Sequence, residues 1–168
     1  MKKGIFILVL LLVAITTNAQ EIADNTIGIR LGNYNGIGPE VSYQKKISDN
    51  SRLEAGLSWR GHVNYNDVKL VGLYQRVFNF EPLEGMNWYV GAGGGVGFWN
   101  YNSGFYYYDN GRNKSNGVYF LAAGNGGVEY KFKFPLLVSF DVRPEFGFAN
   151  FRKGLDVDVA IGARYTFN

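Results

Sequence analysis

Hydrophobic and polar residues alternate one by one along most of the chain, in segments of about ten residues. The last segment shows this best: Leu155, Val157, Val159, Ile161, Ala163, Tyr165 and Phe167 alternate with Asp156, Asp158, Ala160, Gly162, Arg164 and Thr166. A period of two residues indicates a β-strand with one apolar and one polar face. A tilted strand of about ten residues is long enough to cross the hydrocarbon core of a membrane.

Eight segments of this kind follow one another. Six are regular and lie at residues 27–32, 53–60, 88–98, 118–131, 136–148 and 155–167. Two are weaker, at 39–47 and at 68–78, where Gln75 interrupts an otherwise apolar face. Short turns at 48–51, 81–85 and 133–135 alternate with connections on the opposite side at 34–36, 61–67 and 149–153, where one long segment, 100–116, also lies. The sequence therefore predicts an all-β protein, an eight-stranded antiparallel up-and-down transmembrane β-barrel.

The first nineteen residues have a different pattern. Two lysines follow Met1, and residues 5–15 form an unbroken apolar run that ends before small residues at Thr17 and Ala19. Such a run is too short for a membrane helix, which needs about 20 residues. We expect residues 1–19 to be a cleavable signal peptide and residues 20–168 to form the outer-membrane barrel domain. No cysteine follows the run, so a lipoprotein anchor is not expected.

Composition excludes several classes of function. Removal of Lys2 and Lys3 lowers the formal net charge from +3 to +1, and no basic cluster remains, so a nucleic-acid partner is not expected. The absence of cysteine excludes disulfides, thiol nucleophiles and thiolate metal sites. We expect no cofactor. The 23 glycines and 17% aromatic residues are typical of membrane barrels, in which large rings and small residues line different faces.

Alternation alone does not decide whether the apolar face points outward or into the barrel. A soluble lipocalin-like ligand-binding barrel also alternates, with its apolar residues inside. Here the polar face carries both signs of charge, and we expect these residues to form a paired network in the lumen: Arg30, Glu54, Arg60, Glu129, Lys131, Asp141, Arg143, Glu145, Asp156, Asp158 and Arg164. Aromatic residues of the other face gather near both strand ends, as in membrane girdles: Trp88, Tyr130, Phe132, Tyr165 and Phe167 at one, Trp59, Phe98, Phe146 and Phe148 at the other. The membrane orientation is favoured, with the lipocalin-like barrel as an alternative.

The exported start, the eight alternating strands and the closing Gly162–Phe167 resemble the outer-membrane protein β-barrel family, the small barrels similar to OmpX and to the transmembrane domain of OmpA. The resemblance implies a location in the cell outer membrane of a Gram-negative bacterium, with periplasmic termini. It also implies delivery by the barrel-assembly machinery, which reads a terminal aromatic in such proteins. In this chain Asn168 follows Phe167, so the aromatic residue is penultimate.

Candidate catalytic residues are few. The single histidine, His62, follows the third strand, and Ser58 on the same strand lies about 13 Å from it, too far for a hydrogen bond. The run Gly91–Gly97 lacks the Lys-Ser/Thr of a phosphate-binding loop. We expect these glycines to make room for side chains such as Arg60 or Arg143. Pro144 removes a ladder hydrogen bond, so we expect a bulge or a rim position there.

The long connection at 100–116 is the best candidate for a function. Five aromatic residues lie among Asn, Ser and Gly, a composition favoured in recognition loops: Tyr101, Phe105, Tyr106, Tyr107 and Tyr108. The alternative is a loop that only extends the strands and folds over the mouth. We therefore expect a monomeric, non-enzymatic outer-membrane barrel with a structural or surface-binding role, embedded in outer-membrane lipid. A narrow channel for small solutes and a lipid-modifying enzyme remain as alternatives.

Overall fold

The computed structural model describes residues 22–33, 38–61, 63–102, 104, 107–109, 111–149 and 152–168. The expected signal peptide at 1–19 and His62 lie outside these residues. The strands are β1 (Asn25–Gly32), β2 (Gly38–Ser48), β3 (Ser51–Gly61), β4 (Tyr65–Asn79), β5 (Met86–Tyr101), β6 (Tyr107–Asp109), β7 (Arg112–Lys114), β8 (Asn116–Lys131), β9 (Leu136–Ala149) and β10 (Arg152–Phe167). None of the described residues forms a helix long and apolar enough to cross a membrane.

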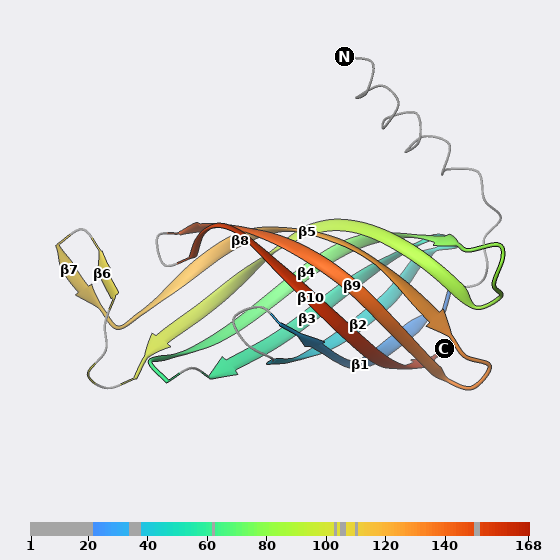
Figure 1. Ribbon diagram of the computed structural model, residues 1–168, viewed down its shortest axis with the longest axis horizontal. Coiled ribbons are helices and arrows are strands. Elements are labelled where there is room, and N and C mark those ends of the chain that lie inside the picture. Colours follow the sequence, from blue (N-terminus) through green and yellow to red (C-terminus); the bar gives the residue numbers. More distant parts are fainter. Residues whose placement is uncertain are drawn as a thin grey trace, which may run out of the picture.

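Eight of these strands close a barrel in the order β1-β10-β9-β8-β5-β4-β3-β2 (Figure 1). All neighbours are antiparallel, and β1 closes the ring on β10 with Asn25 opposite Phe167. The predicted eight-stranded antiparallel barrel is confirmed. β6 and β7 pair with each other in a separate hairpin, which extends beyond one end of the barrel in Figure 1. A closed barrel leaves no strand edge to pair with other chains.

The two ends of the barrel differ. The tight turns after β2, β4 and β8 lie at one end, which we call the turn end, together with the start of β1 and the close of β10. The opposite end, which we call the loop end, carries the β6–β7 hairpin between β5 and β8. Up-and-down connectivity places alternate connections at opposite ends.

The two strands with the weakest patterns are regular in the structure. β2 and β4 extend slightly beyond the predicted 39–47 and 68–78. β4 carries apolar residues on both faces, because Val71, Leu73 and Val77 are buried in the interior while Val68 and Leu70 are exposed outside. Gln75 is fully buried on the interior face, where it interrupts the apolar series Val71, Leu73 and Val77 as expected.

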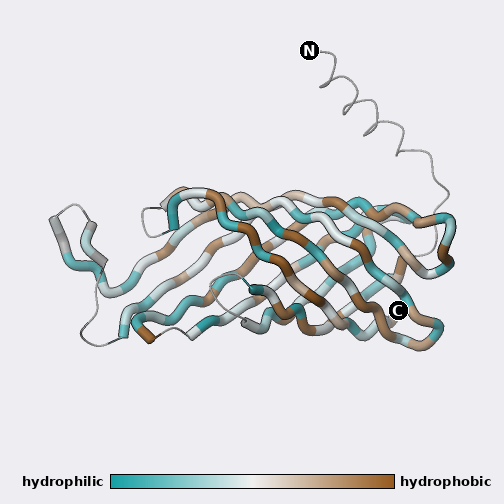
Figure 2. The backbone as a smooth tube through the Cα atoms, in the orientation of Figure 1, coloured by the Kyte–Doolittle hydropathy of each residue, from teal (hydrophilic) through white to brown (hydrophobic). Residues whose placement is uncertain are grey.

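The distribution of side chains is inverted relative to a soluble protein. Large apolar residues of the outward positions are exposed, with Phe120 at 63% and Ile161 at 61%, whereas Arg30 and Arg143 inside the barrel are at 0%. Figure 2 shows hydrophilic and hydrophobic positions following one another along the tilted strands. The lipocalin-like alternative is therefore wrong, because it requires an apolar interior.

Aromatic rings contact one another near both ends of the strands. Toward the turn end, Phe78 and Trp88 stack with centroids 4.2 Å apart, and Tyr130 contacts Phe132 at 4.8 Å. Tyr165 and Phe167 pair at 6.2 Å on β10. Toward the loop end, Phe146 and Phe148 meet edge to face at 5.5 Å, and Trp59 is half exposed.

Pro144 neither forms a bulge nor lies on the rim. The pairs Ala123–Glu145 and Gly126–Val142 on either side of it keep one register between β8 and β9. Between Leu121 and Lys131, only the pairs at 124/144 and 125/143 are missing from that ladder, while the ladder from β9 to β10 continues through Pro144. The expectation of a bulge was wrong because Gly124, opposite the proline, gives the ring room: its Cγ lies 3.3 Å from where a Gly124 side chain would begin.

Candidate functional site

The barrel interior is filled by charged side chains of both signs. Among the described residues, seven basic and six acidic side chains are buried: Arg30, Arg52, Arg60, Lys69, Arg143, Arg152 and Arg164, and Glu40, Glu54, Glu129, Asp141, Glu145 and Asp158. They come from seven of the eight barrel strands, all except β5. The near balance of charge allows each group to be paired, which burial away from water requires.

Two arginines form the ion pairs in the middle of the network. The Arg30 guanidinium lies 2.6 Å from a carboxylate oxygen of Asp141 and 2.6 Å from one of Asp158. Arg143 contacts Glu40 and Glu54, each at 2.9 Å. These contacts join β1, β2, β3, β9 and β10 across the lumen.

Toward the turn end, Arg52 of β3 reaches Glu129 of β8. Arg52 Nη1 and Nη2 donate to the two Glu129 carboxylate oxygens at 2.9 and 2.7 Å, and Arg52 Nε donates to Gln75 at 2.7 Å. The guanidinium lies 4.8 Å from the centre of the Tyr89 ring. A bidentate pair of this kind fixes both the distance and the orientation of its partners.

Toward the loop end, Glu145 accepts hydrogen bonds from two cations. Lys69 Nζ lies 2.8 Å away and Arg152 Nη2 lies 2.5 Å away. The Tyr119 hydroxyl donates to Asp67 at 2.8 Å and accepts from Arg152 at 3.2 Å. These contacts link β4, β8, β9 and β10 toward the loop end.

The predicted network residues are mostly brought together. Nine of the eleven are buried, namely Arg30, Glu54, Arg60, Glu129, Asp141, Arg143, Glu145, Asp158 and Arg164. Asp156 lies at the loop end, partly exposed, 3.4 Å from Arg152. Lys131 is half-buried at the turn end.

Four of the buried charged residues were not predicted from the sequence. Glu40 and Lys69 lie on the two weakly patterned strands, Arg52 precedes the predicted third strand, and Arg152 falls in a segment interpreted as a loop. The period-two series Glu40, Ser42, Gln44 is a signal that would have found the first of these. Arg152 has no such signal, since only the pairing of β9 with β10 places it inside.

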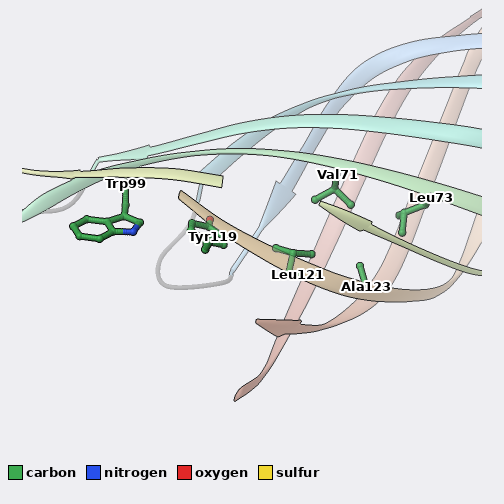
Figure 3. Packing of buried hydrophobic residues seen from close by; sticks show 6 residues of the cluster. All are labelled: Val71, Leu73, Trp99, Tyr119, Leu121 and Ala123. Atoms are coloured by element: carbon green, nitrogen blue, oxygen red, sulfur yellow. The ribbon is translucent and has the colours of Figure 1, made fainter. Parts of the chain in front are cut away.

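One sector of the interior is apolar. Figure 3 shows Val71 and Leu73 of β4, Leu121 and Ala123 of β8, and Trp99 and Tyr119 toward the loop end. Between β4 and β8 lies β5, whose inward positions from 91 to 97 are all glycine.

The atoms nearest these glycines belong to adjacent strands. A side chain on Gly97 would overlap the Tyr119 ring, and one on Gly91 would lie 2.8 Å from Gln75 Cγ. Gly97 therefore makes room for the Tyr119 ring of β8, whereas the atoms nearest to Gly91, Gly93 and Gly95 are backbone carbonyl oxygens of β4. The atoms nearest to these glycines do not belong to Arg60 or Arg143, and Arg60 lies against Gly38.

The candidate catalytic residues do not form a site in the described part of the chain. Ser58 is buried and faces the lumen, away from lipid, and His62 is outside the described residues. Within the described ranges, no group of three His, Cys, Asp or Glu side chains is placed to hold a metal ion.

The predicted recognition residues separate into different environments. Tyr101 is the last residue of β5, and its ring packs 5.5 Å from Trp99 and 5.6 Å from Tyr65. Tyr107 begins β6, and Tyr108 beside it is 70% exposed on the hairpin. Phe105 and Tyr106 lie outside the described residues. Of the two predicted recognition residues whose side chains the structure describes, Tyr101 and Tyr108, Tyr108 is the exposed one.

Comparison with solved structures identifies the fold. The N-terminal β-barrel domain of Pseudomonas aeruginosa OprF matches with a TM-score of 0.65 and 15% identity, over 88% of this chain and 100% of that one. Neisserial surface protein A matches with a TM-score of 0.62 and 14% identity, over 85% of this chain and 94% of that one.

The chain has the fold of a small outer-membrane β-barrel. Ail, the attachment invasion locus protein of Yersinia pestis, shares it at a TM-score of 0.52 and 14% identity, over 85% of this chain and 96% of that one. No family model matches the sequence, and a comparison with curated proteins finds no match. The resemblance drawn from the alternating strands is therefore confirmed at the level of the fold.

Proposed function

We propose that this protein is an integral barrel of the bacterial outer membrane with a structural or surface-binding role and no enzymatic activity. The inverted distribution of side chains carries the proposal. An exterior on which Ile161, Phe120 and Leu155 are each more than 60% exposed would aggregate in water, whereas lipid covers it at no cost. A spanning structure must also satisfy every backbone polar group, and a closed barrel does so.

The orientation follows the usual asymmetry of such barrels, with short turns in the periplasm and longer loops outside. On this reading both termini are periplasmic and the β6–β7 hairpin faces the exterior. The terminal strand, which ends on Tyr165 and Phe167, is the segment that the barrel-assembly machinery would read. Closure of the ring within one chain supports a monomer.

The interior argues against a general pore. Eight-stranded barrels have lumens just wide enough for side chains to fill, and here paired charges and an apolar sector fill it. Buried carboxylates of the kind that serve as general acids or bases, such as Glu129 and Glu145, are paired with arginine and lysine. The role is therefore sought outside the lumen, and Tyr108 on the hairpin is the exposed aromatic that supports surface recognition of an extracellular ligand.

Two measurements test this proposal. The protein extracted from membranes should migrate differently on a gel before and after boiling, as folded barrels do. Because the chain has no cysteine, single cysteines report topology cleanly. Tyr108→Cys should react with a membrane-impermeant maleimide on intact cells, whereas Asn50→Cys in the turn after β2 should react only after lysis. Recovery as a soluble periplasmic protein, or labelling of Asn50→Cys on intact cells, would overturn the location or the orientation.

The proposed absence of enzymatic activity is tested separately. Lipid A from a deletion strain and from the wild-type strain should have the same acylation pattern by mass spectrometry. A change that the wild-type gene restores, and that a His62→Ala variant does not, would overturn it.

A further inference from the structure

A groove of about 370 Å³ lies on the outside of the barrel at the loop end, across β4, β5 and β8. Its floor is apolar and is formed by Val68, Phe98 and Val118, which are 43%, 56% and 47% exposed. Its rim consists of three asparagines, Asn66, Asn100 and Asn116. No charged side chain lines it.

The register of the sheet makes these six residues into two rows. Val68 pairs with Phe98, and Phe98 pairs with Val118. Two residues further along each strand, Asn66 pairs with Asn100, and Asn100 with Asn116. The amide row therefore lies about 7 Å beyond the apolar row, on the side of the loops.

The amides of this row are available to a ligand. Asn66 donates to the side chain of Asn102 at 3.1 Å. Within the described ranges, no side-chain hydrogen bond is found for Asn100 or Asn116. Each amide group offers two N–H donors and a carbonyl acceptor. Hydroxyl and amide groups match such a surface, whereas a phosphate would call for Arg or Lys.

The floor of the groove continues the surface that we propose to lie in lipid. The next row along the strands toward the turn end is Leu70, Val96 and Phe120, which is again apolar. The groove thus runs from the apolar outer surface to an uncharged rim of amides that can form hydrogen bonds. A molecule that fills it must have its apolar part toward the turn end and its polar part toward the loop end.

We propose that this groove binds a glycolipid of the outer leaflet. An acyl chain would lie against Val68, Phe98 and Val118, and the sugar hydroxyl and amide groups would hydrogen-bond to Asn100 and Asn116. This inference rests on the proposed outer-membrane location with the loop end facing outward. It adds a specific binding site on the lipid-facing surface, which the location does not itself imply.

Native mass spectrometry of the detergent-solubilised, folded barrel tests the inference. Lipid A and phosphatidylglycerol are offered at equal concentration, because both are anionic and acylated but only lipid A carries sugars. The wild-type protein should retain lipid A preferentially. The double variant Asn100→Ala/Asn116→Ala should retain about five- to tenfold less, since each lost hydrogen bond weakens binding severalfold. The control Asn64→Ala/Asn113→Ala removes two exposed loop-end asparagines outside the groove and should bind as the wild type does.

A second pair of variants tests the apolar floor. Val118→Trp fills the groove with a side chain that lipid tolerates, and it should reduce lipid A binding by a similar factor. Val128→Trp places the same ring on the same strand, at an outward valine that is 40% exposed and outside the groove, and should have no effect.

Three results would overturn the inference. They are equal retention of both lipids by the wild type, unchanged binding by both groove variants, and a dimer of this chain that the asparagine variant dissociates. If the protein is heat-modifiable and labelled at its loop end but shows no preference for lipid A, only this inference is overturned. If the protein is not heat-modifiable, the proposed function is overturned as well.

Discussion

Arg52 and Glu129 illustrate how much single residues matter inside this barrel. Both side chains are almost completely buried, and their two hydrogen bonds join β3 to β8. Removing one member of such a pair leaves an uncompensated charge, which costs far more than the pair itself contributes.

We therefore expect Glu129→Gln to lower the free energy of unfolding by about 3–5 kcal/mol, measured by urea titration in lipid vesicles. The double variant Arg52→Gln/Glu129→Gln should recover part of this loss, because it leaves no unpaired charge. Asp49→Asn is the control: Asp49 pairs with Lys46 at 3.6 Å but is 88% exposed, and its loss should cost at most about 1 kcal/mol. Equal effects at the two sites would contradict this account.

Gly93 is a residue whose lack of a side chain is required by its neighbours. A Cβ atom there would overlap the backbone carbonyl oxygen of Gly72. Gly72 itself has open space around its own Cβ position.

We expect Gly93→Ala to destabilise the barrel by about 1–3 kcal/mol through forced backbone shifts. Gly72→Ala, on the adjacent strand, should be nearly neutral. The midpoint of urea unfolding, read from the heat-modifiable gel band, measures both. A similar midpoint for the two variants would show that β4 and β5 separate at little cost.

At the level of elements, β9 carries an unusual residue for a closed sheet. Pro144 has no N–H, and the β8–β9 ladder lacks the two pairs around it although the register is kept. Because the strand is already held in register, the barrel should become more stable when the missing N–H donor is restored.

We expect Pro144→Val to raise the free energy of unfolding by about 0.5–1.5 kcal/mol, the net value of one backbone hydrogen bond. Slower amide exchange near Gly124 should accompany it. A loss of stability would mean instead that the proline ring packs against Gly124 more favourably than a hydrogen bond would.

Elements were predictable from sequence where one face is apolar and the other polar. β9 and β10 show this pattern along most of their length, whereas β4 carries apolar residues on both faces because Val71, Leu73 and Val77 pack inside the barrel. Alternation of apolar and polar residues is a weak signal for such a strand, because both of its faces carry apolar residues. The short β6–β7 hairpin was interpreted as an irregular loop, since three residues are too few to show alternation.

At the scale of the whole molecule, side chains occupy the lumen at several levels. Ion pairs near the turn end, in the middle and toward the loop end lie in succession along the lumen, with Trp99 and Tyr119 against one wall. We expect no conductance steps when the purified barrel is added to a planar bilayer, with a general porin as the positive control. Regular single-channel openings would revive the narrow-channel alternative.

The site was only partly predictable, for reasons that belong to the whole molecule. Alternation indicates which residues face inward, and nine of the eleven predicted charges are buried. It does not indicate which partner each one meets, because pairs such as Arg30 and Asp141 are 111 residues apart and meet only when the ring closes. The outer groove was not foreseen for the same reason, since its two rows come from three strands brought together by register.

The pairing of charges across the lumen also limits how this sequence can change over evolutionary time. Replacing Arg52 or Glu129 alone passes through a poorly folded intermediate, so substitutions at such positions should be inherited as compensated pairs. In related genomes the interior positions should therefore covary in sign across distant strands. The lipid-facing positions, where one apolar residue serves as well as another, should drift independently.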